Sequence, residues 1–138
     1  MVYLEFVVIG VPITNQQSTP QGRTNLAAWR AAVLAAAQAV WNQAPLTINL
    51  KAVVINFYTT NQPSLDLDNM SKPVLDSLEG IVYLDDRQIR QAELTHVPIE
   101  DPFVFAGVSP AIAMAVQAGK AFVYVRIEDP RVPFPLPG

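Results

Sequence analysis

The sequence contains no cysteine and one histidine, and only 15% of its 138 residues are charged. The absence of cysteine excludes a small secreted module held together by disulfides. A hydrophobic content of 51% excludes a disordered chain, and the low charge excludes a solvent-exposed coiled coil. No apolar run approaches the roughly 20 residues that a membrane-spanning helix needs. The opening segment MVYLEFVVIG contains a glutamate and no base, so we expect no signal peptide and a cytoplasmic protein.

The charged residues are unevenly distributed. Nine lysines and arginines oppose twelve aspartates and glutamates, and the net charge of −3 argues against a nucleic-acid partner. Residues 66–86 contain six acids and one base, which gives −5, whereas the remaining eight bases and six acids give +2. The six acids are Asp66, Asp68, Asp76, Glu79, Asp85 and Asp86. So dense a group indicates a site that holds cations.

Strands and helices are expected to alternate along the chain. β-Branched and aromatic residues predict strands at residues 2–9, 46–58, 87–98 and 122–127. Helical spacing predicts helices at residues 25–42, 71–79 and 111–118. Thr24 is expected to cap the first helix, after a polar loop that is long enough to be functional. This order predicts one α/β domain over residues 1–128 and a proline-rich tail over residues 129–138.

The acidic window begins with two aspartates separated by one residue. Pro73 lacks an N–H group and does not fit deep inside a helix, so the second helix is expected to start near Ser71. Asp66 and Asp68 then lie on an extended segment, where side chains two residues apart point the same way. Two carboxylates held on one side repel each other unless a cation lies between them.

A second acidic pair, Asp85 and Asp86, follows the helix and can converge with the first pair on one ion. Oxygen ligands favour magnesium or manganese, and the lack of cysteine argues against zinc. Lys72 lies four residues beyond Asp68, where a helical turn brings its ammonium group near the same site. Carboxylates, a divalent ion and one cation are what phosphodiester hydrolysis or phosphoryl transfer requires.

Each of these residues also has a purely structural interpretation. The first acidic pair can be turn or capping residues, and the second can form a polar turn before a strand. Lys72 can form an exposed ion pair with Asp76, four residues later. His96 is expected to be a surface or packing histidine rather than a metal ligand. An EF-hand is excluded, because Ser71 and Ser77 stand where its loop needs glycine and glutamate.

The spacing of the whole segment resembles that of the RusA family of Holliday-junction resolvases. The resemblance rests on Asp66-Leu67-Asp68-Asn69, Lys72, Leu75-Asp76-x-Leu78, Gly80 and Asp85-Asp86-x-Gln88-Ile89. Weaker agreement extends to the first strand, Gly10-x-Pro12 and Asn15. The resemblance implies the α/β (α+β) class, with a small mixed β-sheet of about four strands packed against two to three helices in a single domain.

The resemblance also implies a function. Members of the family are small homodimeric, magnesium-dependent endodeoxyribonucleases, frequently carried by prophages. They resolve Holliday junctions or related branched DNA by paired symmetric nicks, in DNA recombination and repair. Carried over to this chain, the resemblance assigns magnesium, or manganese in its place, to Asp66, Asp68 and Asp86, with Asp85 as an assisting neighbour. It makes Lys72 the catalytic lysine beside these three aspartates, and it gives Asp76 a supporting or structural role.

The loop after the first strand tends to be basic in this family, and here it offers Asn15 and Arg23 as candidate DNA contacts. With so few bases, we expect modest DNA affinity that falls steeply with salt. Two magnesium ions in the acidic window would take the net charge from −3 to about +1, so the acidity does not exclude DNA. Two other functions stay open: a junction-binding protein with little or no cleavage, and a metal-dependent phosphohydrolase acting on a smaller phosphate ester.

Overall fold

The structure is a computed structural model that describes residues 1–59, 66–100 and 107–138. It contains four strands: β1 (Val2–Ile9), β2 (Leu50–Tyr58), β3 (Ile89–Pro98) and β4 (Phe122–Glu128). Between them lie the helices α1 (Pro20–Gln38), α2 (Leu67–Leu78) and α3 (Pro110–Gln117) and the short 3₁₀-helix η1 (Asp86–Gln88). None of the helices in these ranges is long and apolar enough to cross a membrane.

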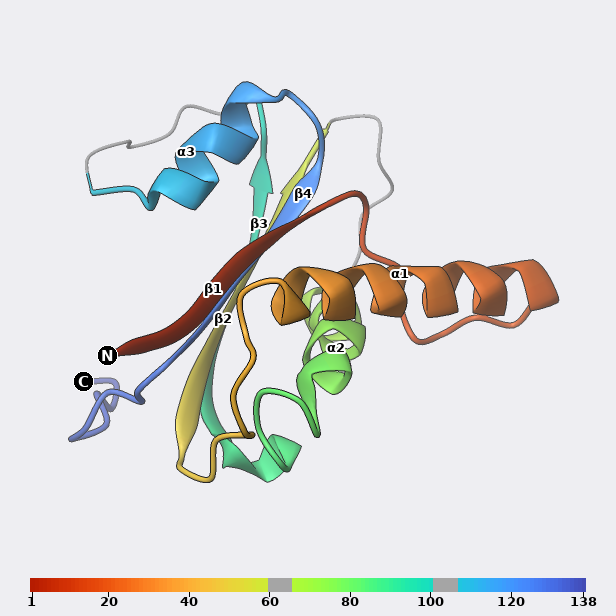
Figure 1. Cartoon of the computed structure of the whole chain (residues 1–138). Helices are drawn as coiled ribbons and strands as arrows, with labels where there is room; N and C mark the ends of the chain where they lie inside the picture. Colours follow the sequence, from red (N-terminus) through yellow and green to blue (C-terminus); the bar gives the residue numbers. More distant parts are fainter. Residues whose placement is uncertain (60–65, 101–106) are drawn as a thin grey trace.

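The strands form one mixed sheet in the order β1-β4-β2-β3 (Figure 1). β4 pairs antiparallel with both β1 and β2, whereas β2 and β3 are parallel. Parallel neighbours need a crossover connection, and α2 with η1 provides it here. The four-stranded mixed sheet and three α-helices confirm the predicted α/β (α+β) class in a single small domain.

α1 and α2 cover one face of the sheet, and α3 covers one end of the other face (Figure 1). Trp29 of α1, Val74 of α2 and Phe6 of β1 belong to the larger apolar cluster, and each is at most 6% exposed. The smaller cluster lies under α3, where the rings of Phe57 and Phe122 stack with centroids 4.4 Å apart. The larger cluster holds α1 and α2 against each other, and this contact positions the site described below.

α1 begins at Pro20 rather than at residue 25, so the prediction that Thr24 caps it is wrong. The N-cap is Thr19, whose hydroxyl oxygen accepts a hydrogen bond from the backbone N–H of Gly22 at 2.9 Å. Pro20 fits the first helical position because the N–H that proline lacks has no partner there. The earlier start moves Arg23 from the expected loop into the first turn of the helix.

α2 begins at Leu67 rather than near Ser71, so the predicted extended segment around Asp68 is wrong. Pro73 lies inside the helix and is buried. The proline removes one backbone hydrogen bond, and burial of its ring offsets part of that cost. Asp66 becomes the N-cap and Asp68 a first-turn residue, so strand alternation does not align their carboxylates. Most of the loop expected between β2 and α2 lies outside the described residues.

All four predicted strands are present in the structure. The strand at residues 2–9 is confirmed, and the strand predicted at residues 122–127 starts as expected at Phe122 and ends one residue later, at Glu128. β2 starts at Leu50 instead of residue 46, because Leu46 forms an isolated bridge with Tyr83. β3 starts at Ile89 because residues 86–88 form η1. Both of these late starts lie beside the acidic segment, where residues that were expected in strands form a bridge or a 3₁₀-helix instead.

Candidate functional site

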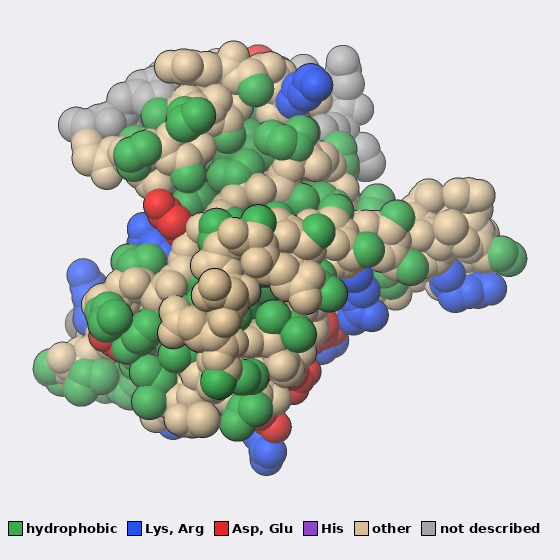
Figure 2. Space-filling model, viewed as in Figure 1, with side chains coloured by type: hydrophobic (Ala, Val, Ile, Leu, Met, Phe, Trp, Pro, Cys, Tyr) green, Lys and Arg blue, Asp and Glu red, His purple; other side chains and the backbone are tan. Residues whose placement is uncertain are grey.

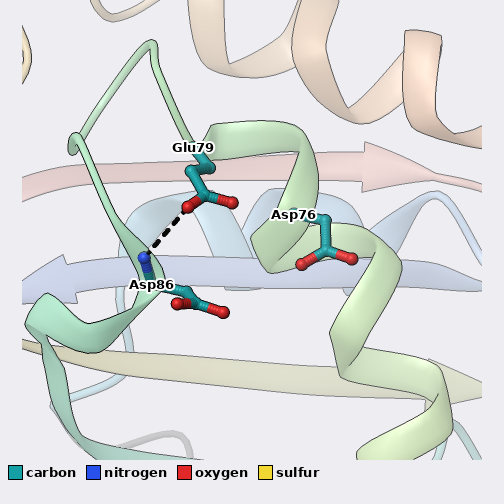
Figure 3. Close-up of side chains that lie close together, drawn as sticks. All are labelled: Asp76, Glu79 and Asp86. Atoms are coloured by element: carbon teal, nitrogen blue, oxygen red, sulfur yellow. Dashed lines mark hydrogen bonds between the residues drawn. The ribbon is translucent and has the colours of Figure 1, made fainter.

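Three carboxylates meet between the end of α2 and η1. Asp76, Glu79 and Asp86 each offer one oxygen, and these oxygens lie within 4.8 Å of one another. Asp76 belongs to α2, Glu79 is its C-cap residue and Asp86 begins η1, and the three carboxylates gather around one space (Figure 3). Asp76 is partly buried and the other two are exposed, so an ion can reach this acidic cluster from solvent.

A tight turn returns the chain to the end of α2. Gly80 has a φ of 85°, which L residues rarely adopt, and its N–H donates to the carbonyl of Tyr83 at 2.6 Å. The Tyr83 side chain is fully buried, and its hydroxyl donates to the carbonyl of Leu75 in α2. Glu79 Oε1 accepts a hydrogen bond from the backbone N–H of Asp86 at 3.2 Å. These contacts hold Asp86 beside the helix end.

Gln88 holds the η1 segment from the other side. Its Oε1 accepts hydrogen bonds from the backbone N–H groups of Leu84 and Asp85, both at 2.9 Å. Its Nε2 donates to the carbonyls of Leu46 and Ile48, at 2.8 and 2.9 Å. One side chain thus ties the second acidic pair to the segment that leads into β2.

Asp85 is engaged by a neighbouring arginine rather than by the acidic cluster. Its carboxylate accepts hydrogen bonds from Arg87 Nε and Nη2, both at 3.0 Å, and from the Arg87 backbone N–H at 2.9 Å. These hydrogen bonds hold the pKa of the Asp85 carboxyl well below its usual range. In the structure Asp85 is therefore the N-cap residue of η1, the 3₁₀-helix that begins with Asp86.

The acidic cluster also affects the buried tyrosine beneath it. Burial, followed by the charges of Asp76, Glu79 and Asp86, raises the pKa of the Tyr83 hydroxyl above its usual range. The tyrosine therefore stays neutral at physiological pH and keeps its hydrogen bond to α2. The three carboxylates beside the tyrosine give the site a negative potential, which favours cations.

Two cations partly neutralise the acidic cluster through Asp76. Arg30 Nη2 of α1 lies 3.2 Å from Asp76 Oδ2, and Lys72 Nζ lies 3.6 Å from Asp76 Oδ1. Lys72 thus forms the ion pair with Asp76 that its structural interpretation predicts. Three carboxylates and two cations leave a local charge of −1.

Asp66 and Asp68 lie at the opposite end of α2, and both are exposed. Asp66 Oδ2 accepts a hydrogen bond from Asn69 Nδ2 at 3.2 Å. At about 1.5 Å per residue, Asp68 stands roughly 12 Å from Asp76 along the helix axis. The structure does not bring Asp66 and Asp68 into the acidic cluster, and their catalytic role stays a prediction.

The acidic cluster includes one predicted metal ligand, Asp86, and two acids that the sequence underestimates. The sequence gives Asp76 only a supporting role and Glu79 none. A signal for them exists: acids three residues apart at a helix end lie on neighbouring positions of its surface, and Gly80 marks a turn that brings later residues back. The long-range contact with Arg30 has no such signal, because the two residues are 46 positions apart.

The candidate DNA contacts lie before and at the start of α1. Asn15 is partly buried, and its Oδ1 has no hydrogen-bond partner among the described residues. Arg23 is exposed, and no acid in the described part of the chain forms an ion pair with it. His96 Nδ1 on β3 lies 3.2 Å from Asn56 Nδ2, and its ring meets that of Tyr58 edge-on. His96 thus packs within the sheet layer, as expected.

Comparison with known proteins places this geometry in a family. The family model described as Endodeoxyribonuclease RusA matches residues 13–127. The match extends from the loop after β1 to β4 and includes α2, η1 and the whole acidic cluster. No curated protein sequence matches the chain. Because the family model covers well over half of the chain, the resemblance first seen in the acidic segment is confirmed, and the chain belongs to the RusA family of endodeoxyribonucleases.

Proposed function

We propose that this protein is a magnesium-dependent endonuclease that resolves Holliday junctions or related branched DNA by paired symmetric nicks, in DNA recombination and repair. Family membership supplies the endodeoxyribonuclease class. Within that class, the proposal is carried by the acidic cluster, where the predicted ligand Asp86 lies with Asp76 and Glu79.

The donor set of the acidic cluster fits magnesium, with manganese as a substitute. All three groups offer carboxylate oxygens, the hard ligands that these ions prefer. Ligands about 2.1 Å from an octahedral ion stand roughly 3 Å from their neighbours, which is closer than the 4.8 Å limit of the cluster. Rotation of the exposed Glu79 and Asp86 side chains can supply this closure. A bound ion would activate water and stabilise the charge that develops on the phosphodiester.

Lys72 is proposed as the residue that contacts the scissile phosphate. Its side chain is 61% exposed, and Asp76 holds its ammonium group at the edge of the acidic cluster. Asp68, Lys72 and Asp76 follow one another at intervals of four residues and so share one face of α2. A DNA strand that follows α2 would pass all three. We therefore propose that Asp66 and Asp68 act on the same strand as Asp86; the resemblance assigns all three aspartates to magnesium.

A homodimer is proposed because of the symmetry of the substrate. A four-way junction has two-fold symmetry, and two symmetric nicks require two equivalent active sites. Within its described residues each chain has one acidic cluster of at least three possible metal ligands. Paired nicks would then require two copies of the chain.

A cleavage assay on a labelled four-way junction tests the proposal. We expect paired nicks with Mg²⁺ or Mn²⁺ and none in the presence of EDTA. Asp86→Asn should abolish nicking, whereas Glu100→Gln, an exposed acid outside the acidic cluster, should leave it unchanged. Failure of the wild type to nick with either ion, or full activity of Asp86→Asn, would contradict the proposal.

The same reaction mixtures distinguish the two alternative functions. Binding of the junction without nicking, across both ions, would identify a junction-binding protein. Hydrolysis of a small ester such as p-nitrophenyl phosphate, with the junction left intact, would identify a phosphohydrolase. The family match and the acidic cluster together support the nuclease.

A further inference from the structure

Three basic residues of α1 and α2 form a row that leads to the acidic cluster. Arg23 and Arg30 lie seven residues apart on α1, so their side chains leave nearly the same face about 10 Å apart. Lys72 of α2 reaches Asp76 at 3.6 Å, and Arg30 reaches the same carboxylate at 3.2 Å. We refer to Arg23, Arg30 and Lys72 as the basic row. It crosses from α1 to α2 and ends at the acidic cluster.

We propose that the basic row binds the DNA backbone and that Arg30 contacts a phosphate beside the acidic cluster. This inference rests on the proposed nuclease function and specifies how the substrate strand reaches the site. It adds Arg30, a residue that nothing in the sequence singles out, to Lys72 and the candidate contact Arg23.

The charges of the basic row are not balanced by the acids that touch it. Among the described residues, Asp76 is the one acid that pairs with Arg30 and Lys72, and none pairs with Arg23. Three cations against the three carboxylates of the acidic cluster leave a local charge of 0, in a chain whose net charge is −3. A divalent ion bound to the acidic cluster would take this region to +2. A cationic strip on an acidic protein indicates an anionic partner.

Arg30 is only partly satisfied by its protein contacts. Its Nη2 donates to Asp76 at 3.2 Å, whereas its Nε is buried and has no hydrogen-bond partner in the described part of the chain. The side chain as a whole is 43% exposed. A guanidinium group has several N–H donors in one plane, so it can bind a phosphate oxygen while it keeps its contact with a carboxylate.

Space for a phosphate exists beside Arg30. A cavity of about 280 Å³ opens between α1 and α2. It is lined by Arg30, Ala31, Leu34, Asp76 and Ser77. Figure 2 shows Lys and Arg atoms along the lower edge of α1, next to Asp and Glu atoms on the body of the protein. Since one strand of duplex DNA rises about 3.4 Å per nucleotide along the helix axis, the ~10 Å between Arg23 and Arg30 spans about three nucleotides when α1 lies along that axis.

Fluorescence anisotropy of a labelled four-way junction in EDTA measures binding without cleavage and tests this proposal. In Arg30→Ala, loss of one phosphate contact should lower the slope of log affinity against log salt by about 0.9, and the affinity about eightfold at roughly 0.1 M salt. Arg30→Lys, which keeps the charge, should retain the slope. Lys120→Ala removes an exposed cation just before β4, away from the basic row, and should change neither quantity. An unchanged slope in Arg30→Ala, or an equal loss in Lys120→Ala, would overturn the proposal.

Asp76→Asn provides a second test that a folding defect does not mimic. The substitution keeps the shape of the side chain but removes the charge that holds Arg30 and Lys72. In EDTA this variant should therefore bind the junction more tightly than the wild type, and weaker binding would overturn the proposal. A wild type that binds through Arg30 without cutting would refute only the proposed function. A wild type that cuts, with unchanged binding by Arg30→Ala, would refute only this inference.

Discussion

The two ends of α2 carry acids in opposite electrostatic settings. At the N-terminal end, Asp66 and Asp68 face the positive end of the helix dipole, which stabilises a carboxylate by about 0.3–1 kcal/mol. At the C-terminal end, Asp76 and Glu79 lie toward the negative end of the dipole and beside Asp86. Carboxylates there are unfavourable unless cations compensate them, and the two paired cations leave the group at −1.

This difference shows that close spacing of acids does not by itself identify an ion site. An acid at a helix N-terminus is stabilised by the helix, and its presence needs no metal to explain it. An acid at the C-terminal end lies close to two other acids, and their repulsion raises the free energy of the folded protein unless cations compensate it. A bound ion would therefore stabilise the chain more at the C-terminal end of α2 than at its N-terminal end.

The largest expected effect comes from removing an ion ligand at the C-terminal end. Asp86→Asn should reduce junction cleavage more than roughly 100-fold, beyond the loss typical of supporting residues. In calorimetric titrations of the free protein with Mn²⁺, Asp86→Asn and Glu79→Gln should both lose most of the binding. Asp66→Asn and Asp68→Asn should keep it, even where they lower cleavage. Equal loss of Mn²⁺ affinity at both ends of the helix would break the comparison.

The next effect concerns the turn that returns Asp86 to the helix. Gln88→Ala removes two accepted and two donated hydrogen bonds and should lower the free energy of unfolding by about 2 kcal/mol. Urea denaturation measures this change. Gln117→Ala, at the exposed end of α3, serves as the control and should change stability by less than about 0.5 kcal/mol. Equal stability of the two variants would mean that Gln88 does not hold the turn.

A matched pair of charge removals should change stability in opposite directions. Without metal, Glu79→Gln removes a repelled charge but keeps the oxygen that accepts from Asp86, so it should stabilise the protein by a few tenths of a kcal/mol. Asp68→Asn removes a charge that the dipole favours and should destabilise it by about as much. Differential scanning fluorimetry in EDTA at low salt compares the two. Shifts of the same sign would show that the dipole does not distinguish the ends.

The smallest effect is the pH dependence contributed by Asp85. Its pKa is lowered by hydrogen bonds from Arg87, so the unfolded chain takes up a proton at higher pH than the folded chain. The contribution to stability is present above the ordinary pKa of 3.8 and is lost as the pH falls below it. Asp85→Asn should therefore show a shallower fall in melting temperature than the wild type between about pH 5 and pH 2.5. Parallel curves would contradict this.

Local sequence patterns predicted most of the fold. The β-branched and aromatic residues near the start of the chain predicted β1 with its observed bounds, and the Ser109-Pro110 start predicted α3 to within one residue. The failures occurred where two local rules conflict. Pro73 argues against a helix, yet Met70 and Val74 pack into the larger apolar cluster and α2 forms around the proline. Burial outweighed the missing hydrogen bond, and no local pattern reports burial.

The candidate site was predicted in part. The sequence identifies the acidic window and Asp86 as a member of it, because the order of residues is a local property, whereas the preference for magnesium stays a prediction. It does not identify Glu79 as a partner of Asp86, since that contact depends on the turn through Gly80 and on the buried Tyr83. It also expects Asp66 and Asp68 to share a face, which requires an extended segment that α2 replaces.

The sequence by itself determined the class of fold, the family and the concentration of negative charge in one window, because these follow from composition and from the order of residues along the chain. Only the tertiary structure decided which acids meet and which cations face them. Packing of α1 against α2 places Arg30 on Asp76 across 46 positions, and the turn at Gly80 brings Asp86 to Glu79. Such contacts form when distant segments pack together through their buried surfaces. The spacing of residues along the chain does not specify which segments pack against each other.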